Sequence, residues 1–397
     1  MTGERSAGGV LRSYYWYQAT ASPVFFWPIF FVFYQERAGL TVPVILWLQS
    51  YSVGMRAVLD FPFGALADRY SRRGCLAASS LAFVVGSGLL LLWPTLVAAV
   101  VAETCFAAAA ALKSGADSAL LYDALAGEGA RELYARAESR GQAITAFGSG
   151  AAAVLGGVMA GIDIRLPYLI TAITALLSAP LAWRLGRASR HVSTRDSTWS
   201  LMRAARVEAA ARAEVRWVMA LAAFSVVASH IYFYLQQPYL RTVGVPVAFF
   251  GVFFAATKLV AAVVADRAHR VDIGYGPRGA TLLMAAAPTV GFAAMSVATR
   301  PLDGLWLLSR GVLDGLWQPL LNVYLNRLVD SRLRATMLSL QSLVARLALA
   351  LTISLLGFGT GRFGLQVMLG AVAALTAIIG AVLFVAGRRF TGALAEV

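Results

Sequence analysis

The chain is a succession of apolar stretches that are each about as long as a bilayer is thick. A transmembrane helix needs about 20 apolar residues. Scanning at that length finds twelve candidates, near residues 14–34, 44–64, 75–95, 97–121, 141–162, 166–184, 217–239, 246–264, 280–299, 304–325, 336–357 and 365–386. Only 14% of the 397 residues are charged, against about 25% in soluble domains. Since these runs lack the alternation of barrel strands, we predict an all-α membrane protein with twelve transmembrane helices.

Basic residues are distributed unevenly along the predicted loops. The formal net charge is +14, and of the 34 Lys and Arg, 24 lie in alternate loops and at the two ends, whereas five lie in the opposite loops. Basic loops stay on the cytoplasmic side, so we expect a multi-pass protein of the inner (cytoplasmic) membrane with cytoplasmic N- and C-termini. This placement accounts for the charge without nucleic acid as a partner. The polar first nine residues lack a cleavage site, so we expect the first span to be retained.

The loop between the second and third spans, residues 64–73, reads GALADRYSRR. It resembles the loop between helices 2 and 3 of the major facilitator superfamily, whose pattern is roughly GxLaDrxgrr, and has Ser71 where the family usually has a second Gly. Ala265, Asp266 and Arg267, followed by Arg270, form a weaker echo at the end of span 8. An internal repeat at matching positions is typical of transporters that are built from related halves.

Two further segments carry the resemblance. Residues 114–123 are similar to a segment common in bacterial facilitators, and Asn326 followed by residues 334–336 resembles their loop before helix 11. The resemblance implies the facilitator fold, with twelve helices in two pseudo-symmetric six-helix bundles, and transport by alternating access. It also implies a conformational latch formed by Gly64, Asp68, Arg69, Arg73 and Asp123. Positive-inside anchoring is the alternative role for Arg72 and Arg73.

The longest loop follows the sixth span and divides the chain into halves. We predict an N-terminal bundle at 1–186, a cytoplasmic linker at 187–216 and a C-terminal bundle at 217–397. Arg203, Arg206 and Arg212 are spaced roughly as on one helix face and could lie on anionic lipid headgroups. The alternative is a solvated basic linker.

Nine ionisable residues fall inside predicted spans, where a lipid-exposed charge costs about 3 kcal/mol, so they must be paired or face water. They are Arg56, Asp60, Glu103, Lys113, Asp117, Lys258, Arg310, Asp314 and Arg346. Three pairs are spaced i and i+4, which puts both side chains on one helix face. These pairs are Arg56 with Asp60, Lys113 with Asp117, and Arg310 with Asp314. Mutual neutralisation is the alternative to a functional role for each pair.

Lys258 is distinguished by its residue type, because the chain has 32 Arg and only two Lys, Lys113 and Lys258. A buried lysine can lose its proton, whereas arginine stays charged; a composition bias towards Arg is the alternative explanation. Lys258 stands eight residues before Asp266, as Asp60 stands before Asp68, so we expect this acid and this base to face each other across a cavity.

The first functional hypothesis is a positive site for an anionic group such as a carboxylate, formed by Lys258 and Arg346 with Arg56. Facilitators of oxalate and of nitrate resemble this chain in the placement of basic residues. The predicted substrate-binding residues are Arg56, Lys258, Arg346, His230, Tyr234, Trp317 and Gln318. For His230, a hydrogen bond between helices is the alternative role.

The second hypothesis is proton-coupled export of amphipathic organic molecules. Span 1 is rich in aromatic residues, and Gly148, Gly156 and Gly157 in span 5 are partly similar to the antiporter motif of drug exporters, although Ala152 and Ala153 occupy its Gly-Pro positions. Close helix packing is the alternative explanation for these small residues. Proton coupling is assigned to Asp60, Glu103, Lys113, Asp117, Arg310 and Asp314.

Other classes of membrane protein are disfavoured. The three His and two Cys residues lack metal-ligand spacing, and a phosphate-cradling GxxxxGK[ST] loop is absent from the sequence. A channel would not need two related halves. We therefore expect a secondary transporter rather than an enzyme, with no cofactor and no metal. Its expected partners are a small-molecule substrate, protons and membrane lipids, and we expect a monomer.

Overall fold

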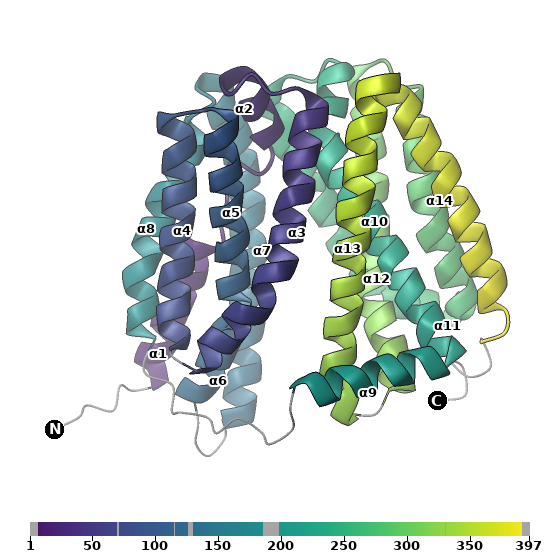
Figure 1. Cartoon of the computed structure of the whole chain (residues 1–397), viewed down its shortest axis with the longest axis horizontal. Helices are drawn as coiled ribbons and strands as arrows, with labels where there is room; N and C mark the ends of the chain where they lie inside the picture. The colour runs from purple at the N-terminus through teal and green to yellow at the C-terminus, as the bar shows by residue number, and fades with distance from the viewer. Residues whose placement is uncertain are drawn as a thin grey trace. The chain divides into compact units, whose positions relative to one another are not determined.

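The computed structural model describes residues 7–69, 71–114, 116–125, 130–185, 198–329 and 331–390. Every regular element in these residues is a helix, so the predicted all-α class is confirmed (Figure 1). The helices group into two compact units, which we call unit 1 and unit 2.

Unit 1 contains the helices of the first half of the sequence and one short 3-10 helix, η1. They are α1 (Ala7–Ala21), α2 (Phe30–Arg37), α3 (Val42–Arg69), α4 (Arg72–Leu92), α5 (Leu96–Lys113), α6 (Ala116–Ala124), α7 (Ala130–Ile162), α8 (Leu166–Arg184) and η1 (Val247–Phe249). The interior of this unit is rich in aromatic rings. Tyr14 and Tyr17 of α1 are fully buried, and Tyr168 of α8 stacks on Phe26 with ring centroids 4.4 Å apart. Span 1 is therefore aromatic largely because its rings fill this core.

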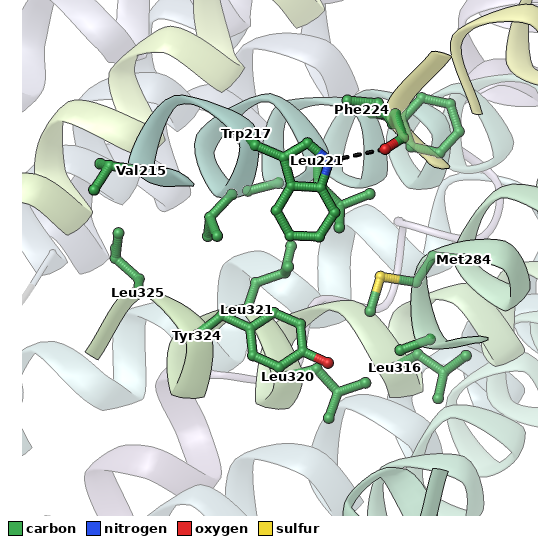
Figure 2. Packing of buried hydrophobic residues seen from close by; sticks show 14 of the residues in the cluster. Val215, Trp217, Leu221, Phe224, Met284, Leu316, Leu320, Leu321, Tyr324 and Leu325 are labelled. Carbon is green, nitrogen blue, oxygen red and sulfur yellow. Dashed lines mark hydrogen bonds between the residues drawn. The ribbon is translucent and has the colours of Figure 1, made fainter. Parts of the chain in front are cut away.

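Unit 2 contains the helices of the second half and a second 3-10 helix, η2. They are α9 (Thr198–Ala211), α10 (Ala213–Thr242), α11 (Phe250–Ser296), η2 (Pro301–Leu307), α12 (Leu308–Leu328), α13 (Ser331–Phe363) and α14 (Leu365–Gly387). Figure 2 shows its core, where Trp217 of α10 lies over Tyr324 of α12 and near Met284 of α11. The indole Nε1 of Trp217 donates to the carbonyl oxygen of Leu383 on α14 at 2.8 Å. This bond satisfies the one polar group that the core ring carries.

The twelve predicted spans map onto these helices with two breaks and one merger. The first span is divided into α1 and α2, because Pro23 and Pro28 lie between them and proline cannot donate a backbone hydrogen bond. The fourth span is divided into α5 and α6. Spans 8 and 9 are joined in α11, which is kinked at Gly276, whose φ is 66°. Pro277 follows, and the residue before a proline disfavours helical geometry.

Nine helical segments in the described part of the chain are long and apolar enough to cross a bilayer by themselves. The α11 segment counts once there, although it holds two of the predicted spans. Helices α1 and α2 are too short separately, and α12 carries Arg310, Asp314 and Arg327, whose charges lower its hydropathy. Among the described residues, the number of such segments is therefore nine rather than the predicted twelve because of local breaks, the merger in α11 and the charges on α12.

Two short segments belong to one unit although the residues on both sides of them in the sequence belong to the other unit. Val42–Ser50 belongs to unit 2, where the Ser50 hydroxyl donates to the carbonyl oxygen of Ala350 at 2.6 Å. Val247–Val252 belongs to unit 1, where η1 packs on α7. The division at 1–186, 187–216 and 217–397 stays a prediction, and residues 186–197 of the linker region lie outside the described residues.

Candidate functional site

Asp314 of α12 is the centre of a charged cluster inside unit 2. Its carboxylate lies 3.3 Å from Nε of Arg310, one helical turn earlier, and 3.9 Å from Nζ of Lys258 on α11. The hydroxyl of Ser229 on α10 donates to Oδ1 of Asp314 at 2.5 Å. The predicted i, i+4 pair is confirmed, and three helices converge on one carboxylate. We call Lys258, Arg310, Asp314 and Ser229 the Asp314 cluster.

The charges of the Asp314 cluster do not balance. Two cations share one carboxylate, and the side chains of Arg310 and Asp314 are only 8% and 12% exposed, whereas that of Lys258 is 52% exposed. The guanidinium of Arg310 also lies 5.5 Å from the ring centroid of Phe233. Since Arg310 is the closer and more buried partner of Asp314, Lys258 is the cation better placed to receive a further anionic group.

The other predicted substrate-binding residues of unit 2 lie on α10, α12 and α13. His230, next to Ser229 on α10, contacts the carbonyl oxygen of Val226 on its own helix through Nδ1 at 2.8 Å, and its ring centroid lies 6.5 Å from that of Tyr234. Trp317 packs against the hydrophobic core of unit 2. Gln318 is exposed on α12, and Arg346 is half-buried on α13.

The predicted pair on α3 of unit 1 is confirmed as well. Nε of Arg56 lies 4.0 Å from Oδ1 of Asp60, and the two side chains are 42% and 23% exposed. This separation is the longest among the ion pairs named here, so the contact is loose.

Glu103 and Lys113, on α5, have hydrogen-bond partners outside their own helix. The hydroxyl of Tyr34 on α2 donates to Oε1 of the buried Glu103 at 2.9 Å. Lys113 and Asp117 were expected on one helix face, but α5 ends at Lys113 and α6 begins at Ala116. Nζ of Lys113 instead donates to the hydroxyl of Ser22 at 3.3 Å. The i, i+4 argument assumed one continuous helix here, and that premise is wrong.

Gln18 and Glu138 extend this polar region and were missed by the sequence interpretation. Nε2 of Gln18 on α1 donates to both Asp117 and the Tyr14 hydroxyl, each at 3.1 Å. Tyr14 in turn donates to Glu138 of α7 at 3.0 Å, and Ser118 donates to the same carboxylate at 2.8 Å. Glu138 lies just before the predicted span 141–162 and therefore counted as a loop residue. We call Tyr14, Gln18, Asp117 and Glu138 the Gln18 network.

Two of the predicted latch residues, Asp123 and Arg73, contact different partners. Nη1 of Arg72, at the start of α4, lies 2.5 Å from Oδ2 of Asp123 on α6, and the Asp123 side chain is only 4% exposed. Arg73 lies instead over the ring of Trp183 on α8, with its guanidinium carbon 4.7 Å from the centroid. A Cβ atom added to Gly64 would meet open space. The side chains of Asp68 and Arg69 lie outside what the structure describes.

A comparison with protein families decides the class of this chain. The family model of the Major Facilitator Superfamily matches residues 19–353. The chain belongs to this superfamily. It is a multi-pass membrane transporter and not an enzyme. No curated protein sequence matched this facilitator.

Solved transporter structures resemble this facilitator along almost its whole length. A mutant of the nucleoside transporter NupG has a TM-score of 0.77 at 12% identity, covering 98% of this chain and 99% of that one. A bacterial homologue of the human lysosomal transporter Spinster has 0.74 at 18% identity, covering 98% of each chain. A mutant of the peptide transporter POT has 0.74 at 13% identity, covering 98% and 95%. The predicted fold, twelve transmembrane helices in two six-helix bundles, is confirmed.

The contact between Arg72 and Asp123 makes a prediction for this facilitator. Replacing Arg72 with Gln leaves a buried carboxylate without its cation, which should cost about 3 kcal/mol of stability. Replacing Arg73 with Gln removes a cation–π contact worth about 0.5–1 kcal/mol. Thermal unfolding in detergent should therefore separate two variants that differ by one position. The double change Arg72→Gln with Asp123→Asn should recover most of the loss, and equal effects at positions 72 and 73 would contradict the assignment.

Proposed function

We propose that this facilitator is a secondary active transporter that moves a small organic solute with an anionic group by alternating access, coupled to protons. The observation that supports the proposal is the Asp314 cluster, where Lys258 and Arg310 share one carboxylate. Lys258, with a half-exposed side chain, would bind the anionic group of the solute. Arg56 and Arg346 remain proposed substrate-binding residues.

The proposed proton-binding groups are carboxylates within the helical units. Glu103 is buried with the Tyr34 hydroxyl as a donor, and Asp314 lies between two cations whose charge a bound solute would partly neutralise. Solute binding at Lys258 would weaken the hold of Lys258 on Asp314. This exchange of partners is a simple way to couple an anionic solute to a proton.

The second candidate function is export of amphipathic molecules by proton antiport. The Gln18 network supports it, since Asp117 and Glu138 together carry two negative charges and the neighbouring Lys113 carries one positive charge. A site with excess negative charge suits a cationic solute. Under this alternative, unit 1 binds the solute and the Asp314 cluster has a structural role.

Lys258→Met should distinguish the two functions. We expect that carboxylates will raise the melting temperature of the purified protein, because a solute that binds the folded state stabilises it. The compounds tested for this stabilisation should also include nucleosides and dipeptides, since the structural neighbours include nucleoside and peptide transporters. In Lys258→Met the shift with carboxylates should disappear, whereas Lys258→Arg should keep part of it.

Uptake into proteoliposomes provides the corresponding transport measurement. Uptake of the stabilising carboxylate should be lost in Lys258→Met, and in the unmodified protein a protonophore should abolish accumulation. Lys258→Arg is the matched control, since it keeps a positive charge at the same position and should keep part of the uptake. Carboxylate transport that survives Lys258→Met, or transport of organic cations that depends on Asp117, would favour the second function.

A further inference from the structure

Helix α9, between the two halves of the sequence, lies crosswise to α13 and α10 of unit 2 (Figure 1). It packs on α10 and α13, which contain the apolar segments that begin at Ala213 and Thr336. Ala209 is buried, whereas Arg203, Arg206 and Val207 are exposed. Helix α9 therefore exposes two basic side chains and the apolar Val207 next to membrane-length helices, a combination that suits a bilayer interface.

A groove of about 760 Å³ runs between α9 and the helices beneath it. Arg203 and Arg206 form its rim, and Met219 of α10 with Leu340 and Val344 of α13 form its floor. This volume is within the range of about 300–1,000 Å³ that is usual for sites of small ligands. The groove thus combines two positive charges with an apolar floor.

A smaller hollow of about 330 Å³ continues this groove along α10. It shares Met219 and Val344 with the first hollow, and Ala220 and Ala223 extend its wall. Arg216 also borders this hollow, and the small side chains leave a shallow apolar channel that is open to the surroundings. Such a channel suits a hydrocarbon chain better than a polar solute.

The neighbouring arginines already have protein partners. Nη1 of Arg212 donates to the carbonyl oxygen of Leu328 at 2.5 Å and lies 3.4 Å from Glu208. Arg216 donates to the carbonyl oxygen of Ala210. The expected row of Arg203, Arg206 and Arg212 therefore reduces to two residues at the groove, because Arg212 lies at the break between α9 and α10.

We propose that this groove binds an anionic phospholipid, with its phosphate on Arg203 and Arg206 and the start of one acyl chain against Met219 and Val344. Guanidinium groups bind phosphate oxygens through paired hydrogen bonds. The charge of the rim matches the phosphate, and the channel matches the acyl chain. Neither a soluble phosphate nor a neutral lipid satisfies both halves of the site.

Native mass spectrometry of the full-length protein in detergent tests this proposal with phosphatidylglycerol as the probe and phosphatidylcholine as its uncharged counterpart. The double variant Arg203→Gln with Arg206→Gln should bind phosphatidylglycerol about 30-fold more weakly, which corresponds to about 1 kcal/mol for each basic residue near a lipid surface. The matched control is Arg267→Gln with Arg270→Gln on α11, which removes the same charge from two exposed positions.

A second variant tests the apolar half of the site. Val344→Phe should fill the floor and weaken phosphatidylglycerol binding while the basic rim is unchanged, and it applies even if the arginine variant unfolds. Glycerol phosphate, which has the charge but no acyl chain, should not compete. Equal binding of both lipids, full competition by glycerol phosphate, or an equal loss in the α11 control would each overturn the proposal.

Discussion

Asp314→Asn should produce the largest loss of stability among single changes of charged residues in unit 2. The variant keeps the size of the side chain but leaves Arg310, whose side chain is 8% exposed, without a negative partner. Removing one partner of a buried ion pair typically costs about 3–5 kcal/mol. Lys258 adds less to this loss because its half-exposed ammonium can be solvated. We expect a lowered melting temperature in detergent and a loss of solute transport.

The double variant Arg310→Met with Asp314→Leu separates the structural and transport roles of the pair. Replacing both members of a buried ion pair with apolar residues of similar size is often neutral or stabilising, so this variant should unfold near the temperature of the unmodified protein. It should still fail to transport, since Asp314, the proposed proton-binding carboxylate of the cluster, is gone although Lys258 remains. Transport by a stable double variant would show that the pair only neutralises itself.

The helical spans were predictable because hydropathy acts over a whole span. The all-α class and the family followed from span length and from the segment at residues 64–73. The breaks in the helices were not predicted, since each depends on a local feature such as Pro23 and Pro28 or on the end of α5 at Lys113. An apolar window of 20 residues averages over a break of two to eight residues, so its mean barely changes.

The site was predictable only where both partners lie on one continuous helix. The pairs Arg310 with Asp314 and Arg56 with Asp60 followed from their i, i+4 spacing and are present. The contact of Lys258 with Asp314 joins two helices, and no sequence spacing encodes it. The symmetry argument that sets Asp60 opposite Lys258 stays a prediction, because it concerns residues of different units.

Gly156→Ala should destabilise the protein although it adds a single methyl group. A Cβ atom at Gly156 on α7 would lie 1.9 Å from the carbonyl oxygen of Phe25, closer than real Cβ contacts come. The obstructing atom belongs to the backbone, so no side-chain rotation relieves the clash, and overpacking of this kind costs about 1–3 kcal/mol. Thermal unfolding in detergent should show a clear decrease in melting temperature.

Gly150, on the same helix, provides the control with the opposite expected sign. A Cβ atom there would meet nothing within 4 Å, and replacing an unhindered helical glycine with alanine typically stabilises by about 0.5–1 kcal/mol. Opposite shifts for Gly156→Ala and Gly150→Ala would mean that close packing against Phe25 is enough to explain the glycine at position 156. If Gly156→Ala unfolds like the unmodified protein but transports no solute, the glycine is needed for a movement of α7 during transport. The similarity of span 5 to the antiporter motif would then support the export function.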